Sequence, residues 1–428
     1  MSEWSQVDIF FRRQEMDNGI QRLYSRENEL LLLCARTDMA EDHMKKVQRL
    51  VQEKLDWAYL LAMAAQHGLL SLLFKNLSSC HHVLPPPVLV QLRTFYMTNS
   101  ARNEYLSREL IALLEGFKAE KIDALPFKGP ALAAMAYGDI SLRHFIDLDF
   151  LVMQPQLRSA FHVMKARGFT LKGSKADQDQ KPSAHKKTYT FTRGEGMAEV
   201  RVDLQSLIIG DHFAVPIDDD SLWERVTTIS LTGKPVPSLG TEDLLIILCI
   251  HGSKHLWEKT KWICDVAELI GRHESTLNWR FVHEQACRLR GQHMLELGLH
   301  MVNFLRVVGS CTRANTSRVS WAACGANTLI PVTAAWLSDE LFNPSTKVPN
   351  TFKEKAFHRF LRADITSRFL KYLYLCLMPL PRKYWARLPH PRIFAWFYAT
   401  VGGVRLLGRH VVRSLKVKQS IARWVKLS

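Results

Sequence analysis

Apolar residues spaced three and four apart predict helices at both ends of the chain, and short alternating runs predict strands between them. Helical spacing covers residues 20–77 and 88–120, with a proline-rich break at Pro85–Pro87. It returns at Thr241, where a hydroxyl suited to capping precedes Glu242 and Asp243, and continues to about residue 345. Two helical regions therefore flank a segment of different character.

The middle segment alternates between strand and helix patterns. Residues 123–129 (DALPFKG) and 144–153 (HFIDLDFLVM) are typical of strands, and residues 155–168 form an amphipathic helix. Residues 186–208 predict a hairpin across Gly194–Gly196. The order indicates an α+β fold with a central sheet of four or five strands. We expect four parts: an N-terminal helical region (1–120), a mixed core (121–235), a C-terminal helical region (236–350) and a basic tail (351–428).

Charge is concentrated in the last part of the chain. Residues 351–428 hold 17 Lys and Arg against two acids, which is 15 of the formal net charge of +16. The eight cysteines are scattered without a Cys-x-x-Cys pair, and the N-terminus has no apolar core typical of a secretory signal. These features favour free thiols and a cytoplasmic location over a disulfide framework or a zinc ribbon.

Two aspartates interrupt the apolar strand at residues 144–153. Side chains alternate along a strand, so Ile146, Leu148 and Phe150 are expected to face a core, while Asp147 and Asp149 lie side by side on the other face. Adjacent carboxylates repel unless a cation separates them, and hard Mg²⁺ suits their oxygens. The alternative is a strand-end pair that caps loops or pairs with a nearby arginine.

A third acid lies on the predicted hairpin. Asp203 alternates with buried positions, and if its strand lies beside that of Asp147, three carboxylates could hold two metal ions. An exposed hairpin face with Arg201 as ion-pair partner is the alternative. Lys128 and Gly129 end a strand and open a helix, where a phosphate can bind. An exposed lysine and a simple glycine turn are the competing interpretations.

The ordered set of Lys128-Gly129, Arg143, Asp147, Asp149 and Asp203 resembles the polymerase β-like nucleotidyltransferases. It is most similar to the bacterial branch of nucleotidyltransferase family 5 type, which has Lys-Gly where most relatives have Gly-Ser. The branch often has V-D-L-H-W around the third acid, whereas this chain has V-D-L-Q-S. Downstream, His251, His255 and Asp265 follow the pattern of a helix with two histidines and then an aspartate. Lys254 and Lys261 could reach a phosphate, and solvated lysines are the alternative.

The resemblance implies a polymerase β-like core and assigns a role to each residue of the motif. Asp147, Asp149 and Asp203 would be catalytic and hold two Mg²⁺, and Lys128, Gly129 and Arg143 would hold the triphosphate of an NTP donor. The weaker positions (His251, Lys254, His255, Asp265) would face substrate, and packing is the alternative for the histidines. The expected reaction moves a nucleoside monophosphate to an acceptor (small molecule, sugar, peptide or protein) and releases pyrophosphate.

A non-catalytic binding module with the same fold is the alternative function, favoured by the altered segment after Asp203. Residues 365–428 interleave bases with apolar residues, a pattern that suits an anionic membrane surface. A helix packed on the protein is an equal alternative, and nucleic acid is less favoured. The chain is thus expected to be cytoplasmic, with the tail as a candidate contact to the inner face of the membrane.

Overall fold

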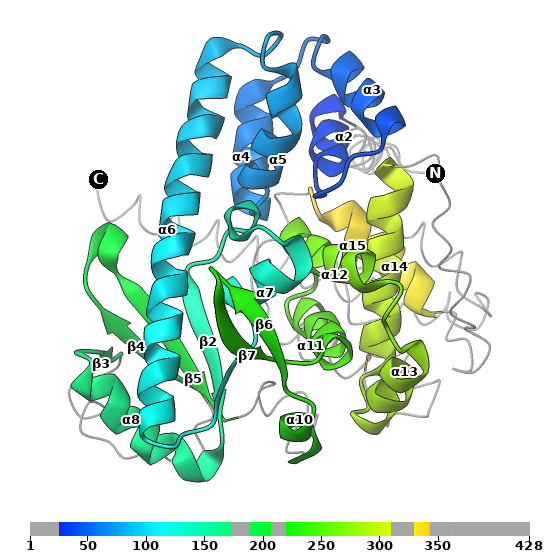
Figure 1. Ribbon diagram of the computed structural model, residues 1–428. Helices are drawn as coiled ribbons and strands as arrows, with labels where there is room; N and C mark the ends of the chain where they lie inside the picture. Colours follow the sequence, from blue (N-terminus) through cyan, green and yellow to red (C-terminus); the bar gives the residue numbers. More distant parts are fainter. Residues whose placement is uncertain (1–24, 173–187, 207–219, 310–328, 343–360, 362–428) are drawn as a thin grey trace, which may run out of the picture.

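The computed structural model describes residues 25–172, 188–206, 220–309, 329–342 and 361. The described chain is mixed α and β, with helices at both ends and a small sheet between them (Figure 1). This order confirms the α+β class predicted from periodicity. The basic tail, apart from Leu361, and residues 173–187 lie outside the described residues.

Helices precede the sheet, as the apolar spacing predicts. They are α2 (Arg26–Leu33), α3 (Glu41–Leu50), α4 (Trp57–His67), α5 (Leu70–Leu77), a 3₁₀ turn η1 (Ser78–Cys80) and the long α6 (Pro86–Ala119). Local chemistry sets their ends: Asp56 accepts a hydrogen bond from the Tyr59 amide at the start of α4, and Gly68 ends it with φ 71°. Pro86 opens α6, where a missing N–H has no cost.

The central sheet has five strands in the order β1-β2-β5-β4-β3. They are β1 (Ala124–Pro126), β2 (Asp147–Val152), β5 (Val200–Gln205), β4 (Thr188–Arg193) and β3 (Thr170–Leu171). Strands β2 and β5 are parallel, whereas the pairs β1–β2, β4–β5 and β3–β4 are antiparallel. The predicted hairpin is confirmed as β4–β5, which puts β5 directly beside the strand that carries the aspartate pair.

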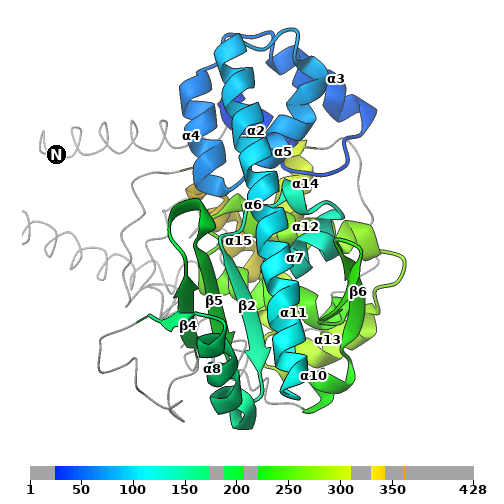
Figure 2. The same ribbon diagram turned by 60° about the vertical axis from the view of Figure 1, so that its left-hand side comes forward.

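Each face of the sheet has its own cover. Leu148, Phe150 and Val152 of β2 pack into one core with residues of α6 and of α8 (Leu157–Ala166). Leu151, on the opposite face, belongs to a second core, which joins helices from before and after the sheet. Figures 1 and 2 show α6 running from the N-terminal helices down along the sheet, so one helix ties the two halves together.

The connection between β1 and β2 winds through three short helical turns. It contains α7 (Gly129–Leu132), a π-helical turn η2 (Ala133–Tyr137) and a 3₁₀ turn η3 (Ile140–Leu142). Asn103 of α6 donates hydrogen bonds to the carbonyls of Ile140 and Arg143 at 2.6 and 2.8 Å. These bonds fix the chain that leads into β2. Two more 3₁₀ turns follow, η4 (Gln154–Gln156) after β2 and η5 (Gly196–Ala198) within the hairpin.

The helices after the sheet complete the second core. They are α10 (Asp220–Glu224), α11 (Thr241–Lys254), α12 (Thr260–His273), α13 (Trp279–Arg288), α14 (Gln292–Gly309) and α15 (Leu329–Glu340). The start of α11 corrects one expectation: Gly240 is the capping residue and no side chain caps the helix, while Glu242 and Asp243 do occupy its first turn. The Asp243 carboxylate does not cap the helix but accepts a hydrogen bond from Arg225 Nε, with the nitrogen 2.9 Å from Oδ2.

A two-stranded sheet was not predicted. Strands β6 (Thr227–Leu231) and β7 (Lys234–Ser238) pair across Thr232 and Gly233, whose φ values of 50° and 82° are those of a tight hairpin turn. Ile146 is a second correction, because β2 begins at Asp147 and leaves the Ile146 residue 56% exposed rather than in a core. No helix in the described ranges is long and apolar enough to cross a membrane.

Candidate active site

Three carboxylates lie together on one face of the sheet. The parallel register pairs Asp149 of β2 with Asp203 of β5, and Asp147 with Arg201. Asp149 is buried, while Asp147 and Asp203 are half-buried, on the face opposite to Leu148 and Phe150. The strand pairing therefore brings the third acid beside the first two, as the sequence analysis required.

These carboxylates open into a cavity of about 350 Å³ between the sheet and helices α11 and α12. The predicted residues that line it are Lys128, Gly129, Arg143, Asp147, Asp149, Asp203, His251, Lys254 and His255. The same cavity is lined by Lys261, and by Gln205, Trp262 and Ile146, which the sequence analysis did not place in the site. Asp265 does not line it.

Lys128 and Gly129 connect β1 to α7 at the rim of the cavity. Gly129 has φ 53°, and a Cβ atom there would stand 3.0 Å from the carbonyl oxygen of Asp147. Glycine is thus required both by the backbone conformation and by the close approach of β2. The Lys128 ammonium lies 3.9 Å from Oδ1 of Asp149, with 17% of its side chain exposed, so it points into the cavity rather than to bulk water.

Asp149 is the most enclosed of the three acids. Burial raises its pKa to about 6, with Asp147 and Asp203 adding to the rise and Lys128 opposing it. Its Oδ1 accepts a hydrogen bond from the side-chain amide of Gln205 at 2.8 Å. The Asp149 carboxylate therefore accepts one amide hydrogen bond and lies at ion-pair distance from one ammonium, and these contacts do not offset the effect of burial on its pKa.

Asp203 is less well satisfied. Its Oδ1 is buried and makes no hydrogen bond within the part of the chain that the structure describes. The Arg201 Nε, which the sequence analysis considered as an ion-pair partner, stands 3.9 Å away, at ion-pair distance but beyond hydrogen-bond distance. A buried carboxylate oxygen without a donor is costly, so this position calls for a cation or a donor from a ligand.

The three carboxylates are not arranged around one common metal position. Among the described residues, no three His, Cys, Asp or Glu side chains gather closely enough to hold a metal ion. The type of donor suits Mg²⁺, since all three are carboxylates on neighbouring strands. The orphaned Asp203 oxygen also fits a cation, whereas Asp149 is turned toward Gln205.

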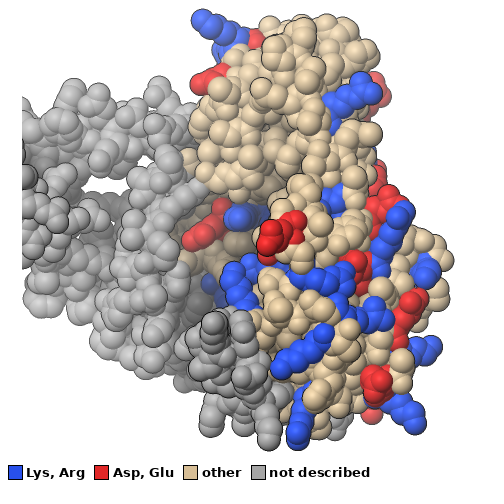
Figure 3. Space-filling model, turned by 90° about the vertical axis from the view of Figure 1, so that its left-hand side faces the viewer, with Lys and Arg blue, Asp and Glu red and all other residues tan. Residues whose placement is uncertain are grey.

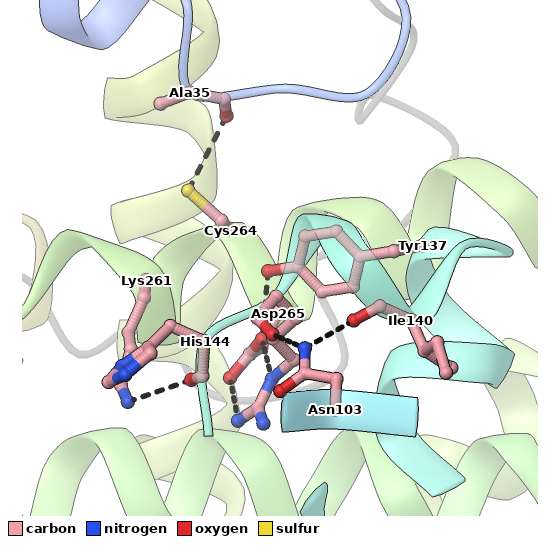
Figure 4. Close-up of polar contacts among 9 residues, drawn as sticks. Ala35, Asn103, Tyr137, Ile140, His144, Lys261, Cys264 and Asp265 are labelled. Carbon is pink, nitrogen blue, oxygen red and sulfur yellow. Dashed lines mark hydrogen bonds and ion pairs between the residues drawn. The ribbon is translucent and has the colours of Figure 1, made fainter. Parts of the chain in front are cut away.

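Arg143 and Asp265 bind each other instead of pointing separately into the cavity. Arg143 donates Nε and Nη2 to the two carboxylate oxygens of Asp265, at 2.7 and 2.9 Å, and both side chains are buried. Burial alone would lower the pKa of Arg143, but the Asp265 carboxylate more than offsets it and raises this pKa. The Tyr137 hydroxyl donates to the same Asp265 at 2.8 Å (Figure 4).

A model of a protein family described as "uncharacterised nucleotidyltransferase" matches residues 53–306, more than half of the chain. The chain belongs to this nucleotidyltransferase family. The comparison confirms the resemblance found in the sequence motifs. No curated protein and no solved structure matches the chain.

The range shared with the nucleotidyltransferase family runs from α4 to α14 and contains every residue of the cavity. It thus includes the sheet that carries the three acids and both helices on the far wall. Because the match stops at residue 306, the basic tail at 351–428 lies outside the family similarity.

The helical wall of the cavity combines aromatic rings and lysines. His251, His255 and Trp262 pack against one another with ring centroids 4.8 to 5.5 Å apart. Burial, with Lys128 adding, holds the pKa of His251 well below its ordinary value, so this ring is neutral. The packing alternative for the histidines therefore has a physical basis, even though both rings also line the cavity.

Lysines of α11 and α12 face the carboxylates. Burial lowers the pKa of Lys254, and Lys128 adds to this. Burial also lowers the pKa of Lys261 to about 8, with Arg143 adding to the shift. The sequence shows that Lys261 lies close after the end of α11. Whether its side chain reaches the cavity depends on how α12 packs, which the sequence does not show. On the outer surface, many Lys and Arg side chains lie on the face shown in Figure 3, which is the left-hand side of Figure 1. They gather on its lower half, over the part of the molecule that holds the sheet.

Proposed function

We propose that this cavity is the active site of a Mg²⁺-dependent nucleotidyltransferase with a polymerase β-like core. The observation that carries the proposal is the meeting of three carboxylates from adjacent parallel strands with four cationic side chains in one cavity. Carboxylates alone would suit many sites, and cations alone would suit any anion. Their combination matches a donor that carries both phosphates and a divalent metal.

Asp147, Asp149 and Asp203 are the residues that would hold the metal. When bound, Mg²⁺ would neutralise charge on the phosphates and acidify the attacking hydroxyl. The buried Asp203 oxygen supports this assignment, because it makes no hydrogen bond among the described residues and has only the Arg201 guanidinium, 3.9 Å away, as an ion-pair partner. Asp149 supports it through burial among acids, which raises its pKa to about 6 in the absence of a bound cation.

The cations would hold the triphosphate. Lys128 reaches the cavity from the β1–α7 connection, while Lys254 and Lys261 reach it from the helical wall. Burial lowers the pKa of both helical lysines, and a bound polyanion would reverse this shift and keep them charged. Arg143 also lines the cavity, but two of its nitrogens are bonded to Asp265, so it can present only its remaining edge to a phosphate.

Asp203 would act on the acceptor. The acceptor oxygen attacks the α-phosphorus of the NTP, its proton passes to Asp203, and the bond from the α-phosphorus to the bridging oxygen breaks. The products are a nucleotidylated acceptor and pyrophosphate. Asp203 is half-buried and lines the cavity, so its carboxylate can take up a proton there.

The test uses NTPs labelled with ³²P at the α or the γ position, incubated with the protein, Mg²⁺ and a cell extract as acceptor source. Transfer of a nucleoside monophosphate retains the α label and loses the γ label. We expect an Asp147→Asn, Asp149→Asn double variant to lose at least about 100-fold of the α-label transfer, because the metal ligands are gone. Calorimetric titration of ATP and GTP with and without Mg²⁺ measures binding in parallel.

Asp123→Asn is the matched control. Asp123 lies just before β1, at the end of the sheet away from the cavity, so its loss should leave transfer unchanged. Transfer of the γ label, or unchanged transfer by the double variant, would refute the proposal. Metal-dependent NTP binding without any transfer would instead support the non-catalytic binding module.

A further inference from the structure

The end of helix α4, in the N-terminal helical region, lies against the start of α12, which forms part of the cavity wall. The Thr260 amide, the first of α12, donates a hydrogen bond to Nδ1 of the buried His67 at 3.2 Å, and the Thr260 hydroxyl lies 3.0 Å from the same nitrogen. The first amides of a helix have no partner within it, so His67 supplies one from 193 residues away. The two helix ends are therefore fixed to each other.

Gly68, which ends α4, is covered by the stem of Lys261. Its φ is 71°, and a Cβ atom at this position would stand 2.8 Å from Cδ of Lys261 and 3.6 Å from its Cβ and Cγ. The lysine stem thus occupies space that a side chain at position 68 would fill. The same lysine donates from Nζ to the His144 carbonyl oxygen at 3.4 Å, just before the strand that carries Asp147 (Figure 4).

This packing determines where the ammonium of Lys261 lies. Lysine has a long flexible stem, and ordering such a stem around an anion reduces the affinity for that anion. Here the stem is already held between Gly68 and the His144 carbonyl, while the half-buried side chain lines the same cavity as the three carboxylates. The lysine is therefore ordered by folding, before any ligand binds.

We propose that Gly68 is a positioning residue, which directs Lys261 toward the triphosphate of the donor and so makes the N-terminal helical region part of the nucleotide site. The inference rests on the proposed function for the role of Lys261 as a phosphate contact. His67 fixes the start of α12, and Gly68 leaves the space in which the stem reaches the cavity. A side chain at position 68 would displace the lysine rather than unfold the helix, because the nearest atom belongs to a flexible stem.

Binding of inorganic triphosphate tests the proposal, because this probe carries the phosphates without a base. It is titrated calorimetrically in excess Mg²⁺ at pH 7, where the Lys261 ammonium is charged, since burial lowers its pKa only to about 8. Lys261→Met keeps an apolar stem and removes the charge, and we expect binding to weaken about tenfold or more. Gly68→Asn should weaken binding about three- to tenfold, because it displaces the ammonium without removing it.

A double variant shows whether Gly68 acts through Lys261. In the Lys261→Met background, Gly68→Asn should cause no further loss of triphosphate affinity, because no ammonium remains to be displaced. A merely structural role of Gly68 would weaken binding equally in both backgrounds.

Gly168→Asn is the matched control. Gly168 follows α8 with φ 78°, close to the conformation of Gly68, but an added Cβ would meet Cδ of Arg193 at 3.7 Å, an ordinary contact. Asparagine tolerates this backbone conformation, so Gly68→Asn and Gly168→Asn should lose similar stability in urea. The control should bind triphosphate like the wild type. Gly68→Ala, which adds the same Cβ without further atoms, is a second variant with the same expectation as Gly68→Asn.

The outcomes separate this inference from the proposed function. Normal binding by Gly68→Asn, a similar loss in Gly168→Asn, or an equal loss in both backgrounds overturns the positioning and leaves Lys261 as a phosphate contact. Full affinity in Lys261→Met overturns the phosphate role of Lys261 and the inference with it, and leaves the carboxylates to the label-transfer test. Absence of triphosphate binding by the wild type overturns the phosphate site of the cavity and the proposed function as well.

Discussion

The buried contact between Arg143 and Asp265 yields a sharp prediction on stability. Asp265→Asn removes one charge of a pair whose members are 7% and 1% exposed at the side chain. The variant keeps the size of the residue and one carbonyl acceptor. Arg143 then remains as a buried cation with no opposite charge in contact, since its Nε and Nη2 both donate to Asp265.

The magnitude follows from burial. Breaking a buried pair by removing one partner costs about 3 to 5 kcal/mol, and we expect about 3 kcal/mol here, because asparagine still accepts one hydrogen bond. Tyr137→Phe removes only the hydroxyl that donates to Asp265 at 2.8 Å, which predicts about 1 to 2 kcal/mol. The larger loss is a substantial part of the 5 to 15 kcal/mol that typically separates folded from unfolded domains.

Urea unfolding followed by circular dichroism measures both variants. Glu284→Gln is the control, because Arg280 and Glu284 pair at 2.8 Å, nearly the same distance, but are exposed. Its loss should give no measurable change. A cost below about 1 kcal/mol for Asp265→Asn, or one no larger than that of Tyr137→Phe, would refute the view that the buried charge pair fixes Arg143.

Further predictions concern acid stability and close packing. Burial, with Lys261 adding, lowers the pKa of His144 to about 4. The unfolded chain therefore takes up a proton between about pH 6.5 and 4 that the folded chain resists, and stability falls as the pH falls through this window. His144→Asn should remove about 2 kcal/mol of the loss between pH 7 and 5, measured by urea unfolding at both values; an unchanged loss would contradict it. Gly252→Ala puts a Cβ 2.5 Å from the buried Trp257 ring and should cost about 1 to 3 kcal/mol in thermal unfolding, whereas Gly271→Ala meets open space and should stabilise by about 0.5 to 1 kcal/mol. Shifts of the same sign for both glycines would contradict the packing argument.

Much of the fold could be predicted from periodicity, because local patterns and local burial agree. Alternation in β5 places Val200, Val202 and Leu204 in the core and the polar residues on the other face. The hairpin β6–β7 escaped prediction because Pro235 and Pro237 of β7 disfavour a strand, and a two-stranded edge tolerates them. Ile146 was misplaced because alternation was extended one residue beyond the start of β2.

The acids of the site and their basic neighbours Lys128 and Arg201 were predictable, but the Gln205 contact and the residues of the helical wall were not. Alternation alone puts Asp147 and Asp149 on one face, and a hairpin puts Asp203 within reach if β5 lies beside β2. Gln205 was passed over because the motif departs from its usual form at that position, yet its contact depends on register rather than on residue type. The wall residues Lys261 and Trp262 come from α12, and the packing of helices against a sheet is not encoded in a short motif.

Arg143 and Asp265 show why a motif cannot assign roles within a site. Each was predicted to face a ligand, yet they bind each other across 122 residues of sequence and bury both charges. Neither residue could be buried alone without a large cost, so the presence of one requires the other. The resulting clamp joins α12 to the chain entering β2, while Asn103 of α6 holds the same chain from its other side. An ordered set of polar residues therefore mixes those that meet the ligand with those that fix the strand carrying them. Burial and hydrogen-bond partners distinguish these two kinds of residue, and they identify Asp265 as one that fixes the strand.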